Sequence, residues 1–156
     1  MYRMKKNCVV RMLSLLLIIA FIIPVNVCAT EADISSSRAS YYLTSYNTYI
    51  YPDALGKIQI WFSVTGVEYM DDIGVLTVQV FESTDNENWT WVKTYKHDST
   101  TGMLGHNKIY HSGHVVYQGT IGRYYKAYVT IWAGKDGGGD TRYMWTQPKK
   151  ATLFAS

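Results

Sequence analysis

The histidines are the first residues whose spacing could support chemistry, because all four lie between positions 97 and 114. His111 and His114 are spaced so that they could bind zinc if the loop folded back on itself. No strand or helix period places three of His97, His106, His111 and His114 on one face, and Asp98 is the only carboxylate nearby. We therefore predict no metal site and no cofactor, and interpret the cluster as a solvated or pH-sensitive loop.

Two groups of aspartates offer oxygen ligands for calcium, Asp71 with Asp72 and Asp136 with Asp140. A calcium loop places several carboxylate or amide ligands at alternating positions, and this sequence lacks that pattern. Only glycines separate Asp136 from Asp140. We predict a plain hairpin turn there rather than an ion site or a phosphate loop.

Catalytic motifs are missing from the sequence. It has no Gly-x-Ser-x-Gly elbow and no His-Glu-x-x-His pair, and its two cysteines, Cys8 and Cys28, lie near the N-terminus. A carboxylate pair such as Glu68 with Asp72 could serve glycoside chemistry, but any chain with 12 acidic residues offers such pairs. We predict that the protein is not an enzyme.

Aromatic side chains give the clearest functional signal. The chain has five tryptophans and 14 tyrosines, and a two-residue alternation turns Trp61, Phe81, Tyr128 and Trp132 away from the core. Flat exposed rings can stack on the apolar face of a sugar or supply contact area in a protein interface. The same rings could instead cover the outer face of a sheet through cross-strand pairs. We predict these four as ligand-binding residues, with the structural reading left open.

Strands must position these rings, and three segments show the alternation of half-buried strands. These three segments are 57–64, 76–81 and 125–132. Weaker strand patterns cover 41–51, 89–96, 114–118 and 141–146. Seven short strands with turn signals between them predict an all-β fold, a single antiparallel β-sandwich of the immunoglobulin or galactose-binding kind. A small barrel is the alternative architecture.

Turn residues separate these strands. We predict hairpin turns at Ser83–Asn88 and Lys135–Asp140, where Asp, Asn and Gly residues gather. Residues 97–113 are expected to form a long exposed connection. Of Trp89 and Trp91, which flank the first turn, at least one is expected to lie in the core.

The predicted domain organisation is simple. A β-sandwich domain at 41–147 follows a flexible leader at 30–40 and precedes a short tail at 148–156. The tail is too short for a membrane anchor and holds no sorting motif. We expect the protein to be released or held non-covalently at a surface, in an oligomeric state that the sequence leaves open.

Residues 1–29 read as a secretory signal peptide. Basic residues open the segment, an apolar run from Leu15 to Ile23 follows, and small residues end it. The apolar stretch is shorter than the roughly 20 residues that a transmembrane helix needs. We predict cleavage after Ala29, or alternatively after Ala32, and a secreted, extracellular protein. Val27 stands before Cys28, where a lipoprotein signal wants a small residue, which argues against lipidation.

Cleavage would change the composition. Four of the 15 basic residues lie in the signal, which leaves 11 basic against 12 acidic residues in the exported part. The basic pI therefore gives no support for nucleic-acid binding. Both cysteines would also be removed, so the exported domain would hold no disulfide. Secretion without disulfides favours a Gram-positive bacterial source.

Several segments of the domain share a pattern with one family. These are Ser36–Leu43, Gly56–Ile60, Met70–Gly74, Phe81–Ser83 with Asn88–Thr90, and Tyr125–Thr130 with Ala133–Lys135. They resemble small secreted proteins of Gram-positive, clostridia-type bacteria that have no assigned function. The resemblance covers roughly residues 36–147 and implies secretion and a single domain, but supplies no activity and no site residues.

A narrower resemblance covers Phe81–Thr90. This segment is similar to the Ser-x-Asp-Gly-x-x-Trp hairpin of discoidin-type and sugar-binding β-sandwiches. Asn86 stands where that hairpin has glycine, a tolerable change because asparagine also adopts the left-handed conformation. In those domains the hairpin is part of the scaffold and not the binding site.

Three functions remain open from the sequence. The first is an extracellular recognition module for carbohydrate or cell envelope, suggested by the outward aromatic residues. The second is a secreted antibacterial or effector protein, and the third is a cell-surface assembly subunit that uses its sheet edges. No nucleic-acid partner and no transmembrane segment in the exported protein are expected.

Overall fold

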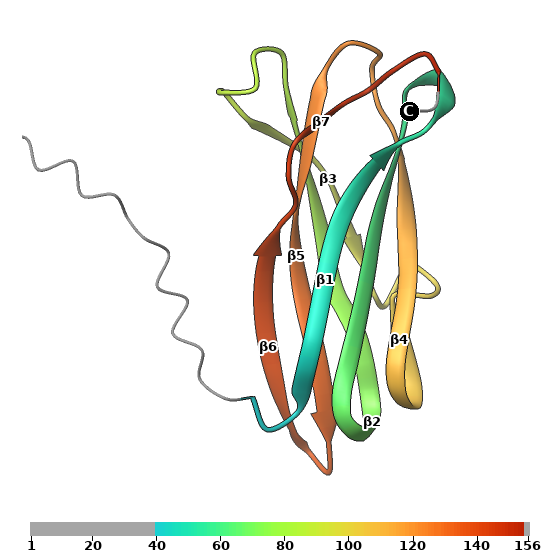
Figure 1. The fold of residues 1–156 in the computed structure, drawn as a ribbon, viewed down its shortest axis with the longest axis vertical. Coiled ribbons are helices and arrows are strands. Elements are labelled where there is room, and N and C mark those ends of the chain that lie inside the picture. The colour runs from blue at the N-terminus through green and yellow to red at the C-terminus, as the bar shows by residue number, and fades with distance from the viewer. Residues whose placement is uncertain (1–39, 155–156) are drawn as a thin grey trace, which may run out of the picture. The chain divides into compact units, whose positions relative to one another are not determined.

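The computed structural model describes residues 40–154. The predicted signal peptide and nearly all of the predicted leader therefore lie outside the described residues. The described part is built of strands with one short 3-10 turn, as Figure 1 shows. The elements are β1 (Leu43–Pro52), η1 (Ala54–Gly56), β2 (Lys57–Ser83), β3 (Thr90–Lys96), β4 (Leu104–Gln118), β5 (Tyr124–Lys135), β6 (Gly138–Trp145) and β7 (Lys149–Lys150).

The strands form one antiparallel sheet of seven strands that curls into a sandwich, as predicted. Strand β2 links the two layers, because its 27 residues belong to both. Its first part, from Lys57 to Thr65, lies between β1 and the second part of β4. We call these strands layer one. Its second part, from Asp72 to Ser83, pairs with β5 along its length and with β3 near its end.

Layer two consists of β3, the second part of β2, β5 and β6. The start of β4 also belongs to it, because Leu104 pairs with Gly74. The ribbon of β2 and β4 folds over between the layers, where the pairing is interrupted between Thr65 and Met70 (Figure 1). Asn107, on the β4 side of this fold, has a positive φ of 50°.

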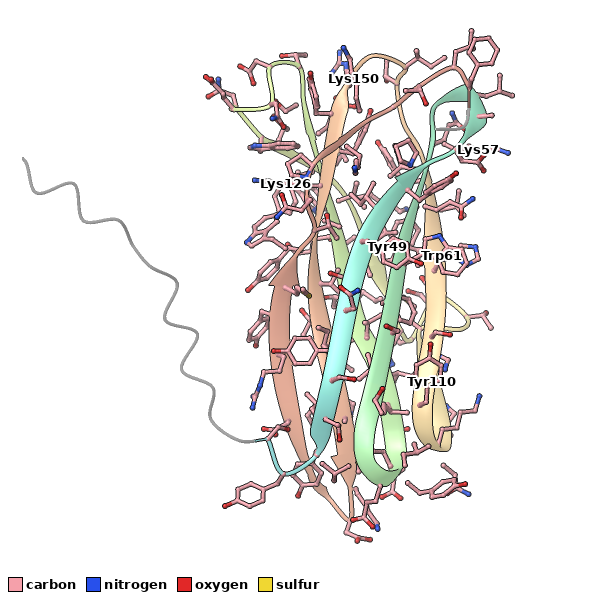
Figure 2. The ribbon with its side chains drawn as sticks, in the orientation of Figure 1. Tyr49, Lys57, Trp61, Tyr110, Lys126 and Lys150 are labelled. Atoms are coloured by element: carbon pink, nitrogen blue, oxygen red, sulfur yellow. The ribbon has the colours of Figure 1, made fainter. Side chains whose placement is uncertain are left out.

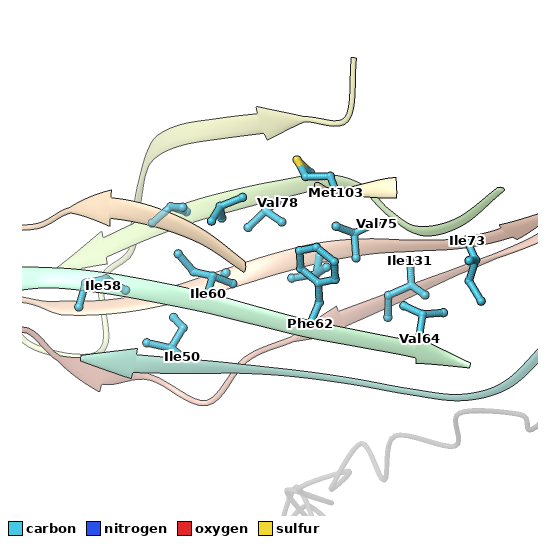
Figure 3. Packing of buried hydrophobic residues seen from close by; sticks show 14 of the residues in the cluster. Ile50, Ile58, Ile60, Phe62, Val64, Ile73, Val75, Val78, Met103 and Ile131 are labelled. Carbon is cyan, nitrogen blue, oxygen red and sulfur yellow. The ribbon is translucent and has the colours of Figure 1, made fainter. Parts of the chain in front are cut away.

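Alternation explains how the core fills the space between the layers. Inward-facing positions of β2 and β5 are almost completely buried, whereas their outward neighbours are only partly buried. A bulge between Val75 and Thr77 resets the alternation, so that Val75 and Val78 both face inward. The buried side chains of both layers meet in one cluster, part of which is drawn in Figure 3. Its largest members are Tyr125, Phe62, Ile58, Ile60, Met70, Ile73, Met103 and Ile131.

The predicted strands at 57–64, 76–81 and 125–132 are confirmed, and 57–64 and 76–81 prove to be parts of the same strand, β2. The predicted exposed connection at 97–113 is wrong in its second half, because β4 begins at Leu104. Its core-facing positions include Gly105 and Gly113, which hide the alternation. A Cβ atom at Gly113 would lie 2.7 Å from the Phe62 ring, so only glycine leaves room for that ring.

Both predicted hairpin turns are present. At the first, the Ser83 hydroxyl and the Asp85 carboxylate accept hydrogen bonds from the backbone of the turn, and Asn86 has the expected left-handed conformation with φ 65°. A hydrogen bond from the Asn88 side chain, followed by those from the Asn88 and Glu87 backbone N–H groups and the Ser83 hydroxyl, lowers the pKa of Asp85. At the second, Lys135 pairs with Gly138 across a two-residue turn. This turn is tighter than the predicted span of 135–140.

The expectation that Trp89 or Trp91 lies in the core is wrong. Trp89 is half-buried and Trp91 is 57% exposed. The register shift between Val80 and Phe81 places Trp91 opposite Phe81, an outward residue of layer two. Tryptophan is accommodated at this strand edge because its Nε1 donates a hydrogen bond to Thr94 at 3.0 Å.

Candidate ligand-binding surface

The four predicted binding residues lie on two different outer faces. Phe81, Tyr128 and Trp132 are on layer two, on β2 and β5, and Trp61 is on layer one. All four are half-buried, and their sequence neighbours on the strand are buried, except Glu82 beside Phe81, which is partly buried. The structure therefore brings three of the predicted residues to one face and leaves the fourth on the other.

On layer two, aromatic rings from three adjacent strands contact one another. We call Phe81, Tyr128, Tyr143 and Trp145 the aromatic patch. The Trp145 ring lies 5.2 Å from that of Phe81 and 4.8 Å from that of Tyr128, measured between centroids. Tyr143 stacks on Tyr128 at 5.8 Å with nearly parallel planes. Tyr143 and Trp145 lie on the edge strand β6 and remain 61% and 47% exposed, so their rings are accessible to a ligand.

One cation lies within this aromatic surface. The Lys126 Nζ atom is 4.3 Å from the centroid of the Trp89 ring and 4.6 Å from that of Trp145. Cation–π attraction holds an ammonium group over a ring face at such distances. Lys126 therefore links the hairpin residue Trp89 to the patch, and it places a positive charge where a ligand on the patch would meet it (Figure 2).

Trp132 lies farther along β5, where its ring packs against the β5–β6 hairpin. Its ring covers the β5–β6 hairpin so closely that a Cβ atom at Gly139 would lie 2.3 Å from it. Glycine is required there because any side chain would collide with the ring. Beside Trp132 is a cavity of about 140 Å³, lined also by Asp71, Asp72, Gly134, Lys135, Gly137 and Gly138.

On layer one, Trp61 is the centre of a row of three rings. Tyr49 of β1 stacks beside it at 6.3 Å and His114 of β4 at 4.4 Å, and Tyr49 and Trp61 are labelled in Figure 2. The Trp61 Nε1 donates to Gln59 at 2.9 Å, and the Gln59 amide donates to Asp53 at 3.0 Å. The pKa of Asp53 is lowered by the Ala54 backbone N–H and by this amide. Trp61 is thus fixed on several sides.

The histidines separate in the structure. Three of them, His97, His106 and His111, line an open cavity of about 500 Å³, and His114 lies in the aromatic row instead. The expectation that Asp98 is the only nearby carboxylate is wrong, because His106 Nδ1 lies 2.6 Å from Asp72. His111 bonds the Gly102 carbonyl at 2.9 Å. Among residues 40–154, no three His, Cys, Asp or Glu side chains form a metal-binding group.

Sequence reasoning missed Tyr143, Trp145 and Lys126. The predicted strand at 141–146 contains Tyr143 and Trp145, which alternate with Met144 and therefore share the face opposite to it. Their contact with Tyr128 depends on the register that pairs Trp145 with Tyr128 and Tyr143 with Thr130. A single sequence does not supply this register.

Within residues 40–154, no helix is long and apolar enough to cross a membrane. No protein-family model and no curated protein matches the sequence. Among solved structures, one similar chain is Spo0M, a sporulation control protein from Bacillus subtilis. Its TM-score is 0.36 with 11% identity, over 67% of this chain and 49% of that one.

A second similar structure is a family 76 glycoside hydrolase from a bovine Bacteroides thetaiotaomicron strain. Its TM-score is 0.32 with 13% identity, over 67% of this chain and 20% of that one. The chain thus spans about half the length of Spo0M and a fifth of the hydrolase. At these TM-scores neither similarity supports a functional inference.

Proposed function

We propose that this is a secreted, non-catalytic recognition module that binds carbohydrate or cell envelope through the aromatic patch of layer two. The observation that carries the proposal is the contact of Phe81, Tyr128, Tyr143 and Trp145 on one outer face, with the edge residues accessible. The signal-like residues 1–29 support an extracellular location, and the segments quoted above support a place among small secreted proteins of Gram-positive, clostridia-type bacteria.

The chemistry of the patch fits a sugar polymer. The apolar face of a pyranose ring can stack on Trp145 or Tyr143, while the tyrosine hydroxyls donate and accept hydrogen bonds at its edge. Phe81 and Tyr128 support these rings from below, so that little side-chain freedom is lost on binding. Trp61 is the alternative stacking platform, but its ring already contacts Tyr49 and His114, and its Nε1 already donates a hydrogen bond to Gln59.

The test is retention of the exported form, residues 30–156, on peptidoglycan, insoluble polysaccharides, mucin and whole bacterial cells. We expect retention on a glycan, release by soluble sugar, and loss in Trp145→Ala and Tyr143→Ala. Tyr69→Ala is the matched control, because Tyr69 is 62% exposed and lies on the fold of β2, away from the patch. Unchanged retention in both patch variants would overturn the proposal.

Retention on live cells without retention on any glycan would favour the effector function. Concentration-dependent association in sedimentation would favour the assembly subunit instead. The first outcome contradicts a carbohydrate ligand, and the second counts against the recognition module only where glycan retention is absent as well.

A further inference from the structure

Four apolar side chains meet solvent at one end of the sandwich, and we call them the apolar tip. Leu55 is 63% exposed, Ile121 50%, Leu153 47% and Phe154 78%. They come from three segments far apart in sequence: η1, the β4–β5 turn and the C-terminal segment after β7. Isolated exposed apolar residues are ordinary, but a group of them at one end marks an interaction surface.

Backbone hydrogen bonds hold the segments of the apolar tip together. Leu55 N donates to Leu153 O at 3.0 Å, and Gly56 N donates to Thr152 O at 2.9 Å. Gly119 N, which begins the β4–β5 turn, donates to Gly56 O at 3.0 Å. The tip is therefore already assembled and does not need to form when a partner arrives.

Leu55 is held in an unfavourable backbone conformation. Its φ is 60°, a left-handed value that costs a residue with a Cβ atom energy that glycine would not lose. Its carbonyl accepts a hydrogen bond from the Gln118 side chain at 2.9 Å, which fixes this conformation. The strain presents a leucine to solvent, where it contributes nothing to the core.

Cations flank the tip. Lys57 follows η1 and Arg123 follows the β4–β5 turn, while Lys149 and Lys150 form β7 just before the tail; Lys57 and Lys150 are labelled in Figure 2. Four carboxylates of the described residues lie at this end, on Asp53, Glu82, Asp85 and Glu87, because the β2–β3 turn follows Ser83, which pairs with Tyr124. Glu87 is exposed, whereas the other three have internal partners, and Asp85 is bonded within its own turn. Asp53 accepts from Ala54 and Gln59, and Glu82 pairs with Arg123 and accepts from the buried Tyr125 hydroxyl.

We propose that the apolar tip docks on an anionic lipid bilayer, with Leu55, Ile121, Leu153 and Phe154 entering the interface and the lysines contacting lipid phosphates. Apolar residues gain by leaving water, and cations beside them are attracted to anionic headgroups. A second copy of the same tip would bring like charges together, which disfavours self-association as its role. This inference does not depend on glycan binding by the aromatic patch.

The opposite end of layer one also exposes apolar residues, but the charges around them differ from those at the apolar tip. Val67 and Tyr69 are exposed there too, but Glu68 stands between them in the sequence, and Asp71, Asp72 and Asp136 lie at the same end. Lys135 pairs with Glu68 at 2.8 Å, which leaves the three aspartates to make this end acidic. The Asp136 N–H donates to Asp71 at 2.8 Å, which places the β5–β6 turn beside the fold of β2. An acidic end of this kind is repelled by anionic lipid, so it supplies a matched control.

The experiment is co-sedimentation of residues 30–156 with vesicles of phosphatidylcholine alone or mixed three to one with phosphatidylglycerol. This form contains every described strand and lacks the apolar run Leu15–Ile23, which would itself bind lipid. We expect binding to the anionic vesicles that is at least tenfold stronger than to neutral ones and weakens with salt. Equal binding to both compositions, or none to either, would overturn the proposal.

Variants separate the tip from the rest of the surface. Leu55→Gly combined with Phe154→Ser should reduce binding at least tenfold, and glycine suits the φ at position 55, so the fold is kept. Lys149→Glu with Lys150→Glu should reduce it similarly. Val67→Ser at the acidic end and Trp145→Ala in the aromatic patch should bind as the parent does. Loss in these two controls, or parental binding by the tip variants, contradicts the proposal.

Discussion

Trp61 on layer one and Trp145 on layer two are both outward tryptophans, yet their surroundings differ. Trp61 lies on a central strand between Tyr49 and His114 and donates a hydrogen bond to Gln59. Trp145 lies on the edge strand β6, contacts the rings of Phe81 and Tyr128 and the ammonium group of Lys126, and is about half exposed. An outward aromatic residue in a central strand is enclosed by its neighbours, whereas one at an edge keeps about half of its surface accessible to a partner.

The largest effect should come from the core that both faces share. Phe62→Ala removes a ring that is 1% exposed and packs against Gly113 and His111. We expect a loss of about 3–5 kcal/mol in the free energy of unfolding, from lost burial and the cavity left behind. Urea denaturation measures this, and both tryptophan faces should unfold at the same urea concentration. Separate transitions would show that the faces have independent cores.

Trp61→Ala should have the next largest effect on stability. The variant loses two ring contacts, a hydrogen bond and most of a half-buried side chain, so we expect about 3 kcal/mol. Glycan retention should remain at the parental level. If retention is lost while the fold is kept, the row on layer one is the binding surface and the comparison above is reversed.

Tyr125 provides a test by pH, because it is fully buried between the faces. Burial, with help from its hydrogen bond to Glu82, raises the pKa of Tyr125 to about 12. The raised pKa of the folded state means that its stabilising contribution is complete below pH 10 and is lost as pH rises through about 12.

We expect a decrease of about 2 kcal/mol in the free energy of unfolding over this window. Tyr125→Phe, measured beside the parent, should show a smaller decrease. The remainder in that variant comes from Tyr95 and Tyr117, whose pKa values burial also raises. An identical alkaline loss in both proteins would contradict the assignment.

Trp145→Ala should have the smallest effect on stability and the largest on binding. About half of this side chain is already exposed, and its loss leaves Phe81 and Tyr128 in place, so we expect about 2 kcal/mol. Glycan retention should disappear. Differential scanning fluorimetry and the retention assay, run on the same samples as Trp61→Ala, give the contrast directly.

Much of the fold could be predicted from the sequence, because the alternation of inward and outward residues is a property of each strand by itself. Ile58 to Val64 and Tyr125 to Ala133 alternate without interruption, and both form strands. The Ser83–Asn88 turn was predictable for the same reason, since Asn86 and Asp85 act through the backbone beside them. The first part of β4, residues 104–113, was not predicted, because Gly105 and Gly113 occupy core-facing positions there and the His111 ring fills the space beside Gly105.

The candidate site was only partly predictable, for a different reason. Outward-facing residues such as Phe81 and Tyr128 follow from alternation within one strand. Their meeting with Trp145 follows from the register between β5 and β6, and the position of Lys126 over Trp89 follows from the pairing of β2 with both β3 and β5. These are relations between strands, which one sequence does not contain.

The length of β2 has a consequence for how the protein unfolds and folds. Because β1, β3, β4 and β5 all pair with it, no hairpin can detach without exposing β2 to solvent. Backbone amides of both layers should then exchange with deuterium at similar rates, through one global opening rather than through separate local ones. The same dependence delays completion of the fold, since Lys57–Ser83 waits for a partner, β5, that begins at Tyr124.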